Sequence, residues 1–141
     1  MVAKADRVDE LEDGTISIID YKTGQPPSGT EISLGFAPQL PLEAAIAQAG
    51  GFSGVVGAPV SLLEFWQLTG GVPAGERRPA GKEIQGLAEA ALRGLTDLVT
   101  RFDNPETPYL SQPDPSHIPR WSDYTHLARV LEWSSIEGGN D

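Results

Sequence analysis

The sequence predicts an α/β fold in which helices flank a mixed central sheet. Two short strand patterns, residues 2–9 and 15–22, are separated by Glu12-Asp13-Gly14, a turn signal that predicts an antiparallel hairpin. Residues 60–68 form a nearly continuous apolar run, which is typical of a strand buried on both faces. We therefore expect a sheet of three or more strands with residues 60–68 at its centre.

Two segments have the apolar spacing of helices. Residues 38–49 place Leu42, Ala45 and Ile46 on one stripe, which predicts a helix directly after the hairpin and its following loop. A longer helix is predicted over residues 82–102, where one apolar face consists of Leu87, Ala91, Leu95, Leu98 and Phe102.

The remaining segments are irregular by composition. Gly and Pro are frequent in residues 23–36, 52–59, 69–81 and 103–120. We expect residues 69–81 to be a mobile loop, in which Arg77-Arg78 either contacts phosphate or is solvated. Residues 122–135 predict a last short helix, and packing of this region is expected from Tyr109, Trp121, Tyr124 and Trp133.

Length and composition bound the class of protein. A chain of 141 residues fits a single domain, which we assign to residues 1–135, with a polar tail over 136–141. The absence of Cys excludes disulfides, thiolate zinc sites and iron–sulfur clusters. No apolar run approaches the ~20 residues of a membrane helix, so we expect a cytoplasmic protein without a membrane partner.

The charge balance limits what the chain can bind alone. Ten basic residues against twenty acidic ones give a formal net charge of −10. Binding of a polyanion requires Lys and Arg, so this balance argues against an autonomous DNA-binding domain. The chain also begins inside a strand pattern, and we therefore expect a fragment of a longer protein, truncated at its N-terminus.

Residues Ile16 to Lys22 end in an acid, an aromatic residue and a lysine. Because strand side chains alternate, Asp20 and Lys22 point to the same face. Asp6 lies opposite Asp20 if residues 12–14 form a three-residue loop with Gly14 in a left-handed conformation, whereas a two-residue turn would put Asp6 opposite Tyr21. The plain alternative is that Asp20 and Lys22 form a surface ion pair worth ~0–1 kcal/mol.

The combination of Asp6, Asp20-Tyr21-Lys22 and Gln39 resembles the RecB-like branch of the PD-(D/E)XK nuclease superfamily. Longer matches, in Ala5–Asp9, Ile19–Gly24 and Pro38–Ala45, are similar to the C-terminal nuclease domains of alphaproteobacterial AddB proteins. Asp123–Val130 is also similar. The resemblance implies a restriction-endonuclease-like core.

The resemblance also implies a mechanism and partners. Asp6, Asp20 and the carbonyl of Tyr21 would bind Mg²⁺, with Mn²⁺ as a substitute, while Lys22 and Gln39 would act beside them with Asp20 in catalysis. The expected function is an exodeoxyribonuclease that acts on DNA in double-strand break repair, in complex with an AddA-like helicase–nuclease subunit. The alternative is a non-catalytic module of the same fold that docks a helicase partner.

Several positions depart from the family or are ambiguous. The family that this chain resembles usually carries a tyrosine where this chain has Glu43, which is either part of the site or a residue of the helix face. The family's upstream acid or histidine has no counterpart here, and we expect the isolated fragment to cut DNA poorly. Glu64 either reaches the site or is a satisfied acid on the central strand, and His117 and His126 lack metal-ligand spacing.

Overall fold

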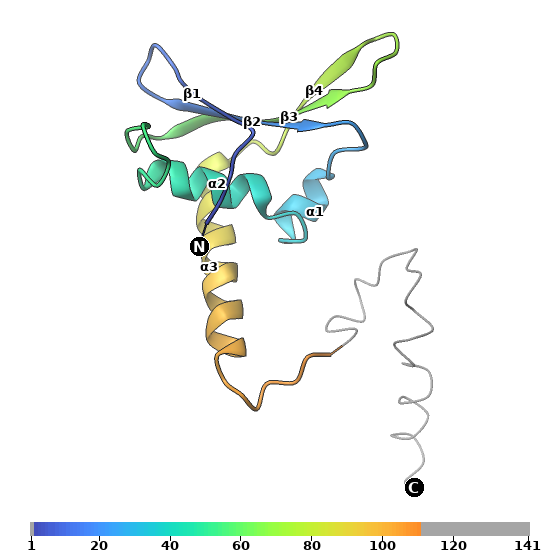
Figure 1. Cartoon of the computed structure of the whole chain (residues 1–141). Helices are drawn as coiled ribbons and strands as arrows, with labels where there is room; N and C mark the ends of the chain where they lie inside the picture. The colour runs from blue at the N-terminus through green and yellow to red at the C-terminus, as the bar shows by residue number, and fades with distance from the viewer. Residues whose placement is uncertain (1, 111–141) are drawn as a thin grey trace, which may run out of the picture. The chain divides into compact units, whose positions relative to one another are not determined.

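A computed structural model of the chain describes residues 2–110. Its centre is a four-stranded sheet in the order β1-β2-β3-β4, formed by Arg7–Glu10, Ile16–Lys22, Val60–Leu68 and Gly75–Pro79. The outer pairs are antiparallel and the central pair, β2 with β3, is parallel. The predicted α/β class with a mixed sheet is therefore confirmed (Figure 1).

The hairpin has the register that the three-residue loop predicts. Val8 pairs with Ile18 and Arg7 with Ile19. Gly14 has a φ of 78°, and the loop is closed by the Leu11 N–H, which donates to the carbonyl of Thr15. Glycine adopts this left-handed conformation without steric cost, so the backbone itself sets the register.

The first strand is shorter than the predicted 2–9, because β1 begins only at Arg7. The reason is the side chain of Asp6, whose Oδ2 accepts a hydrogen bond of 3.0 Å from the N–H of Tyr21. That N–H would otherwise pair with a backbone carbonyl of the neighbouring strand. A side chain thus replaces the next rung of the ladder, at the point where the candidate site begins.

The strand β3 lies at the interior of the sheet, as the apolar run predicted. Its side chains Leu63 and Phe65 are buried, and they pair with Ile18 and Asp20 of β2. The core lies between this sheet and the helices and consists mainly of Ile16, Ile18, Ile32, Leu40, Ala44, Ala47, Val60, Leu63, Phe65, Ala80 and Ala88.

Two helices follow β2. The short α1, Gly29–Ser33, lies within the predicted loop 23–36, and Ser28 and Glu31 form a capping box at its start. The second, α2, spans Gln39–Gln48, close to the predicted 38–49. Its predicted stripe of Leu42, Ala45 and Ile46 is wrong, because these three are only half-buried; the residues that α2 buries are Leu40, Pro41, Glu43, Ala44 and Ala47.

The predicted mobile loop 69–81 contains a fourth strand, β4, which pairs with β3 along Glu64–Leu68. The composition of β4 did not predict a strand, because Gly75 and Pro79 are residues typical of turns. An edge strand tolerates both residues at its ends, since one side of its backbone needs no partner. Arg77 and Arg78 therefore belong to the sheet and point to opposite faces.

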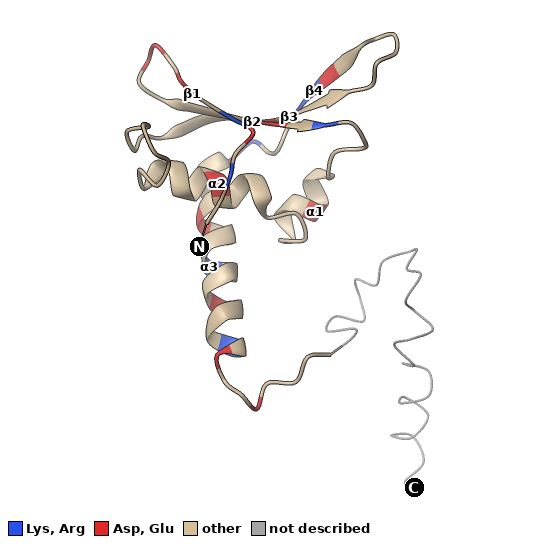
Figure 2. Cartoon of the chain, in the orientation of Figure 1, with Lys and Arg blue, Asp and Glu red and all other residues tan. Residues whose placement is uncertain are grey.

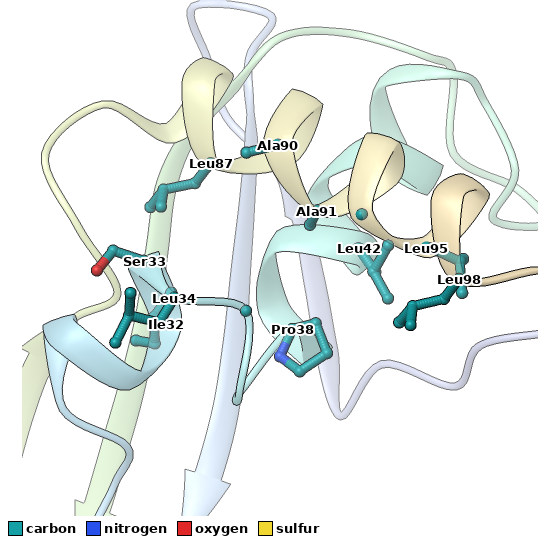
Figure 3. A pocket seen from close by; sticks show the side chains of 12 residues that line it. Ile32, Ser33, Leu34, Pro38, Leu42, Leu87, Ala90, Ala91, Leu95 and Leu98 are labelled. Atoms are coloured by element: carbon teal, nitrogen blue, oxygen red, sulfur yellow. The ribbon is translucent and has the colours of Figure 1, made fainter. Parts of the chain in front are cut away.

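The long helix α3 spans Ile84–Phe102, near the predicted 82–102. Its apolar face lines a pocket of about 330 Å³ (Figure 3). The other walls of this pocket are Pro38, Leu42 and the residues around α1. None of the helices within residues 2–110 is long and apolar enough to cross a membrane. The chain divides after Arg101 into two compact units, and the described part of the second, Phe102 to residue 110, contains a stacked ring pair of Phe102 and Tyr109.

Candidate active site

The end of β2 brings a carboxylate and an ammonium to the face of the sheet that the helices cover. Asp20 is 2% exposed, and its neighbour two positions on, Lys22, reaches back so that Nζ lies 2.8 Å from Asp20 Oδ2. The ammonium also lies over the ring of Phe65, 5.8 Å from its centroid. A buried carboxylate is costly unless it is paired, and Lys22 is its ionic partner.

Asp6 lies beside Asp20 across the hairpin. Continuing the register of Arg7 with Ile19 by one residue places Asp6 opposite Asp20. Its Oδ2 is held by the N–H of Tyr21, while the ring of Tyr21 points to the other face of the sheet and packs edge-on against Trp66. The backbone of Tyr21 therefore lies at the site, and its side chain does not.

Gln39, the first residue of α2, joins these groups. Its amide Nε2 donates to Asp20 Oδ1 at 2.7 Å and to Glu43 Oε1 at 3.3 Å, and its Oε1 accepts from Lys22 Nζ at 3.4 Å. The two donor hydrogens face carboxylates and the acceptor faces the ammonium, so all three contacts agree on one orientation of the amide. The fold thus brings Asp6, Asp20, Lys22 and Gln39 together, as the sequence pattern suggested.

Glu43 is a member of this group that the sequence left undecided. It is 3% exposed, one turn after Gln39 on the buried side of α2. Burial raises the pKa of its carboxyl; the Gln39 hydrogen bond lowers it, the charges of Asp20 and Asp6 raise it further, and Lys22 lowers it. Sequence spacing showed only that Glu43 shares a helix side with Gln39 and could not show which side is buried.

The donor set fits a hard divalent cation. Two carboxylate oxygens, Asp20 Oδ2 and Glu43 Oε2, are buried without a hydrogen-bond partner, although Oδ2 has the ion pair with Lys22. Unpartnered buried oxygens of this kind call for a water or an ion, and Mg²⁺ prefers oxygen ligands. Within residues 2–110, no three acidic or histidine side chains are already gathered around one point at which a metal could be held.

The opposite face of the sheet holds a second buried carboxylate, Glu64. Arg77 binds it through two hydrogen bonds, Nε to Oε2 at 2.8 Å and Nη2 to Oε1 at 3.0 Å, and the indole of Trp66 donates to it at 3.0 Å. The Arg77 hydrogen bond is the main cause that lowers the pKa of Glu64. Glu64 is thus a satisfied acid, which resolves the ambiguity of the sequence.

The second arginine of β4 lies on the face of Asp20. Arg78 pairs with Phe65, the β3 partner of Asp20, and its Nη2 donates to the exposed Glu76. The two arginines therefore differ, since Arg77 binds a buried carboxylate and Arg78 binds a surface one.

His117 and His126, and the predicted helix over 122–135, lie outside the described residues. Figure 2 shows acidic residues along the hairpin and all three helices.

Comparison with known proteins gives a family and a few relatives. A sequence model of the PD-(D/E)XK nuclease superfamily matches residues 1–116. Uncharacterized proteins of Rickettsia conorii, Rickettsia bellii and Rickettsia felis are each 40% identical over 53 residues. These matches cover 38% of this chain and 6% of each relative, so the chain corresponds to a small part of much longer proteins. No solved structure matches it.

Proposed function

Because the chain belongs to the PD-(D/E)XK nuclease superfamily, we propose that it is a metal-dependent nuclease that hydrolyses the phosphodiester bonds of DNA. The observation that carries this proposal is the cluster of Asp6, Asp20, Lys22 and Gln39 where β2 ends. Membership of the superfamily suggests a nuclease in general, and the cluster is the part of this chain that could carry out the chemistry.

The carboxylates of Asp6 and Asp20 and the carbonyl of Tyr21 hold Mg²⁺ in this proposal, with Mn²⁺ as a substitute. The bound cation supplies neutralisation of phosphate charge and a lowered pKa for a bound water. Support comes from the hard oxygen donors and from the buried Oδ2 of Asp20, which accepts no hydrogen bond and has only the ion pair with Lys22.

Lys22 and Gln39 act beside the metal ligands. The ammonium of Lys22 stabilises the negative charge that develops on the phosphate oxygens, and a donor fixed in place before reaction needs no reorganisation. Gln39 orients both partners, since it donates to Asp20 and accepts from Lys22. Together they keep the ammonium at the end of the strand where the scissile phosphate would lie.

The biological setting follows the motif resemblance. We propose an exodeoxyribonuclease domain that acts in double-strand break repair and recombination, within a complex that includes an AddA-like helicase–nuclease subunit. A net charge of −10 fits this arrangement, because other domains or a partner would then hold the DNA. The same charge favours the second candidate, a non-catalytic module that docks a helicase.

Metal binding separates the two candidates. Calorimetric titration of the 141-residue chain with Mn²⁺ is expected to show binding that Asp20→Ala removes. Asp97→Ala, which removes an exposed aspartate of α3, is the matched control and should bind as the wild type does. Absence of binding in the wild type, or equal binding by Asp20→Ala, would contradict the nuclease proposal and favour the docking module.

A further inference from the structure

Glu43 is a buried acid whose surroundings do not compensate it. Its side chain lies on the buried side of α2, where its neighbours Leu40, Ala44 and Ala47 are apolar. One oxygen, Oε2, has no hydrogen-bond partner, and the other accepts a single long bond of 3.3 Å from Gln39. Such a group destabilises a core, because an apolar side chain of the same size would pack there at no desolvation cost.

The charges around Glu43 add to this cost. Asp20 and Asp6 both act on it as negative charges, and Lys22 acts on it as a positive one. The Lys22 ammonium is already engaged 2.8 Å from Asp20. One ammonium therefore faces three carboxylates at this end of the sheet, and the cluster carries an excess of negative charge that a divalent cation would neutralise.

We propose that Glu43 is a third carboxylate of the cation site, and that its free oxygen contributes to binding of a divalent metal with Asp6 and Asp20. The inference rests on the proposed function and extends it to Glu43, a position at which the family pattern has a tyrosine and not an acid. A buried orphan oxygen next to two acids is a group whose partner is an ion or a water.

Gln39 explains how the cluster holds together without the cation. Its NH₂ group donates to Asp20 and to Glu43 at the same time and keeps the two carboxylates near each other. These two hydrogen bonds offset part of the repulsion between the carboxylates. Oε2 of Glu43 accepts no hydrogen bond, and Oδ2 of Asp20 has only the ion pair with Lys22. These two oxygens are the atoms that a cation would use.

The test is Glu43→Gln, which keeps the shape and the acceptor for Gln39 but removes the charge. Calorimetric titration with Mn²⁺ is expected to show affinity weakened by about 10- to 100-fold or more, because loss of even an outer-shell partner of a metal ligand costs this much. The metal-free variant should melt at a higher temperature than the wild type, and added Mn²⁺ should raise its Tm by less. A purely structural role would lower the metal-free Tm and leave the affinity unchanged.

Two further variants make the result decisive. Glu89→Gln removes an exposed glutamate of α3 and should change neither the affinity nor the Tm shift. Glu43→Asp keeps the charge but withdraws it by one methylene, and it serves if Glu43→Gln does not fold; it is expected to weaken Mn²⁺ binding several-fold. Wild-type affinity in the folded Glu43 variants would overturn the proposal.

The outcomes also distinguish this inference from the proposed function. If the wild type binds Mn²⁺, Asp20→Ala loses binding and the Glu43 variants retain it, only the role of Glu43 is wrong. If the wild type itself binds no Mn²⁺, the metal-dependent nuclease proposal fails, and the role of Glu43 fails with it.

Discussion

Two carboxylates, Glu43 and Glu64, are buried on opposite faces of the same sheet and have opposite environments. Glu64 is held by the fork of Arg77 and by the indole of Trp66, and its pKa is lowered. Glu43 has one long hydrogen bond and two acidic neighbours, and its pKa is raised. A fully satisfied buried acid is part of the scaffold, whereas an unsatisfied one beside reactive groups is a candidate for function.

The positively charged side chains on the two faces, Lys22 and Arg77, also differ in how fully they are engaged. Lys22 is a point charge shared between Asp20 and the amide of Gln39, while Arg77 is committed to one partner in a bidentate geometry. We therefore expect changes on the helix-covered face to alter chemistry and metal binding, and changes around Glu64 to alter stability alone.

The largest effect is expected for Lys22→Ala. Mg²⁺-dependent cleavage of DNA by the protein should fall by about 10²–10³-fold, because a fixed positive group no longer stabilises the transition state. The measurement is the rate of nucleotide release, with circular dichroism to verify folding. Near-normal cleavage would exclude Lys22 from the mechanism.

A smaller effect, on stability, is expected for Glu64→Gln. The variant should lose about 1 kcal/mol of unfolding free energy at pH 7. This value is near the lower end of the range for a hydrogen bond to a charged group, because the Arg77 side chain is largely exposed to water. Urea unfolding measures it. Mn²⁺ affinity should stay at the wild-type value, and a change in affinity would break the division between the two faces.

The stability difference between wild type and Glu64→Gln should depend on pH. Since the folded-state pKa of Glu64 is lowered, its contribution is fully present above the unfolded-state value of about 4.3 and is lost as pH falls through the folded-state value. Urea unfolding between pH 3 and pH 7 is expected to show the two proteins converging at the acidic end. A gap that stays constant over this range would contradict the ion pair as its source.

A loss of stability similar to that of Glu64→Gln, without an effect on the site, is expected for Gly14→Ala in the hairpin loop. An added Cβ would meet no atom within 4 Å, so the cost comes from the left-handed backbone alone and should be about 1 kcal/mol. Thermal unfolding measures this cost. A drop in Mn²⁺ affinity in the folded variant would show that the loop also controls the pairing of Asp6 with Asp20.

Much of the fold could be predicted from local patterns. The boundaries of β3 and the approximate extents of α2 and α3 followed from periodicity, and turn chemistry left two hairpin registers, of which the structure has the three-residue loop. A capping box at Ser28 and Glu31 could also have revealed α1. The strand β4 could not be found in this way, because an edge strand needs a neighbour more than it needs an apolar pattern, and its glycine and proline are typical of loops.

The candidate site likewise has features that local sequence patterns predict and features that depend on contacts between distant elements. Strand alternation and turn length are local rules, so the pattern of residues alone predicts that Asp20 and Lys22 share a face and that a three-residue loop would bring Asp6 to them. The surroundings of Glu43 and Glu64, in contrast, depend on contacts between elements that are distant in the sequence. The helix α2 is apolar on nearly every side, so its spacing could not show which side packs on the sheet, and Arg77 reached Glu64 only once β4 had paired with β3.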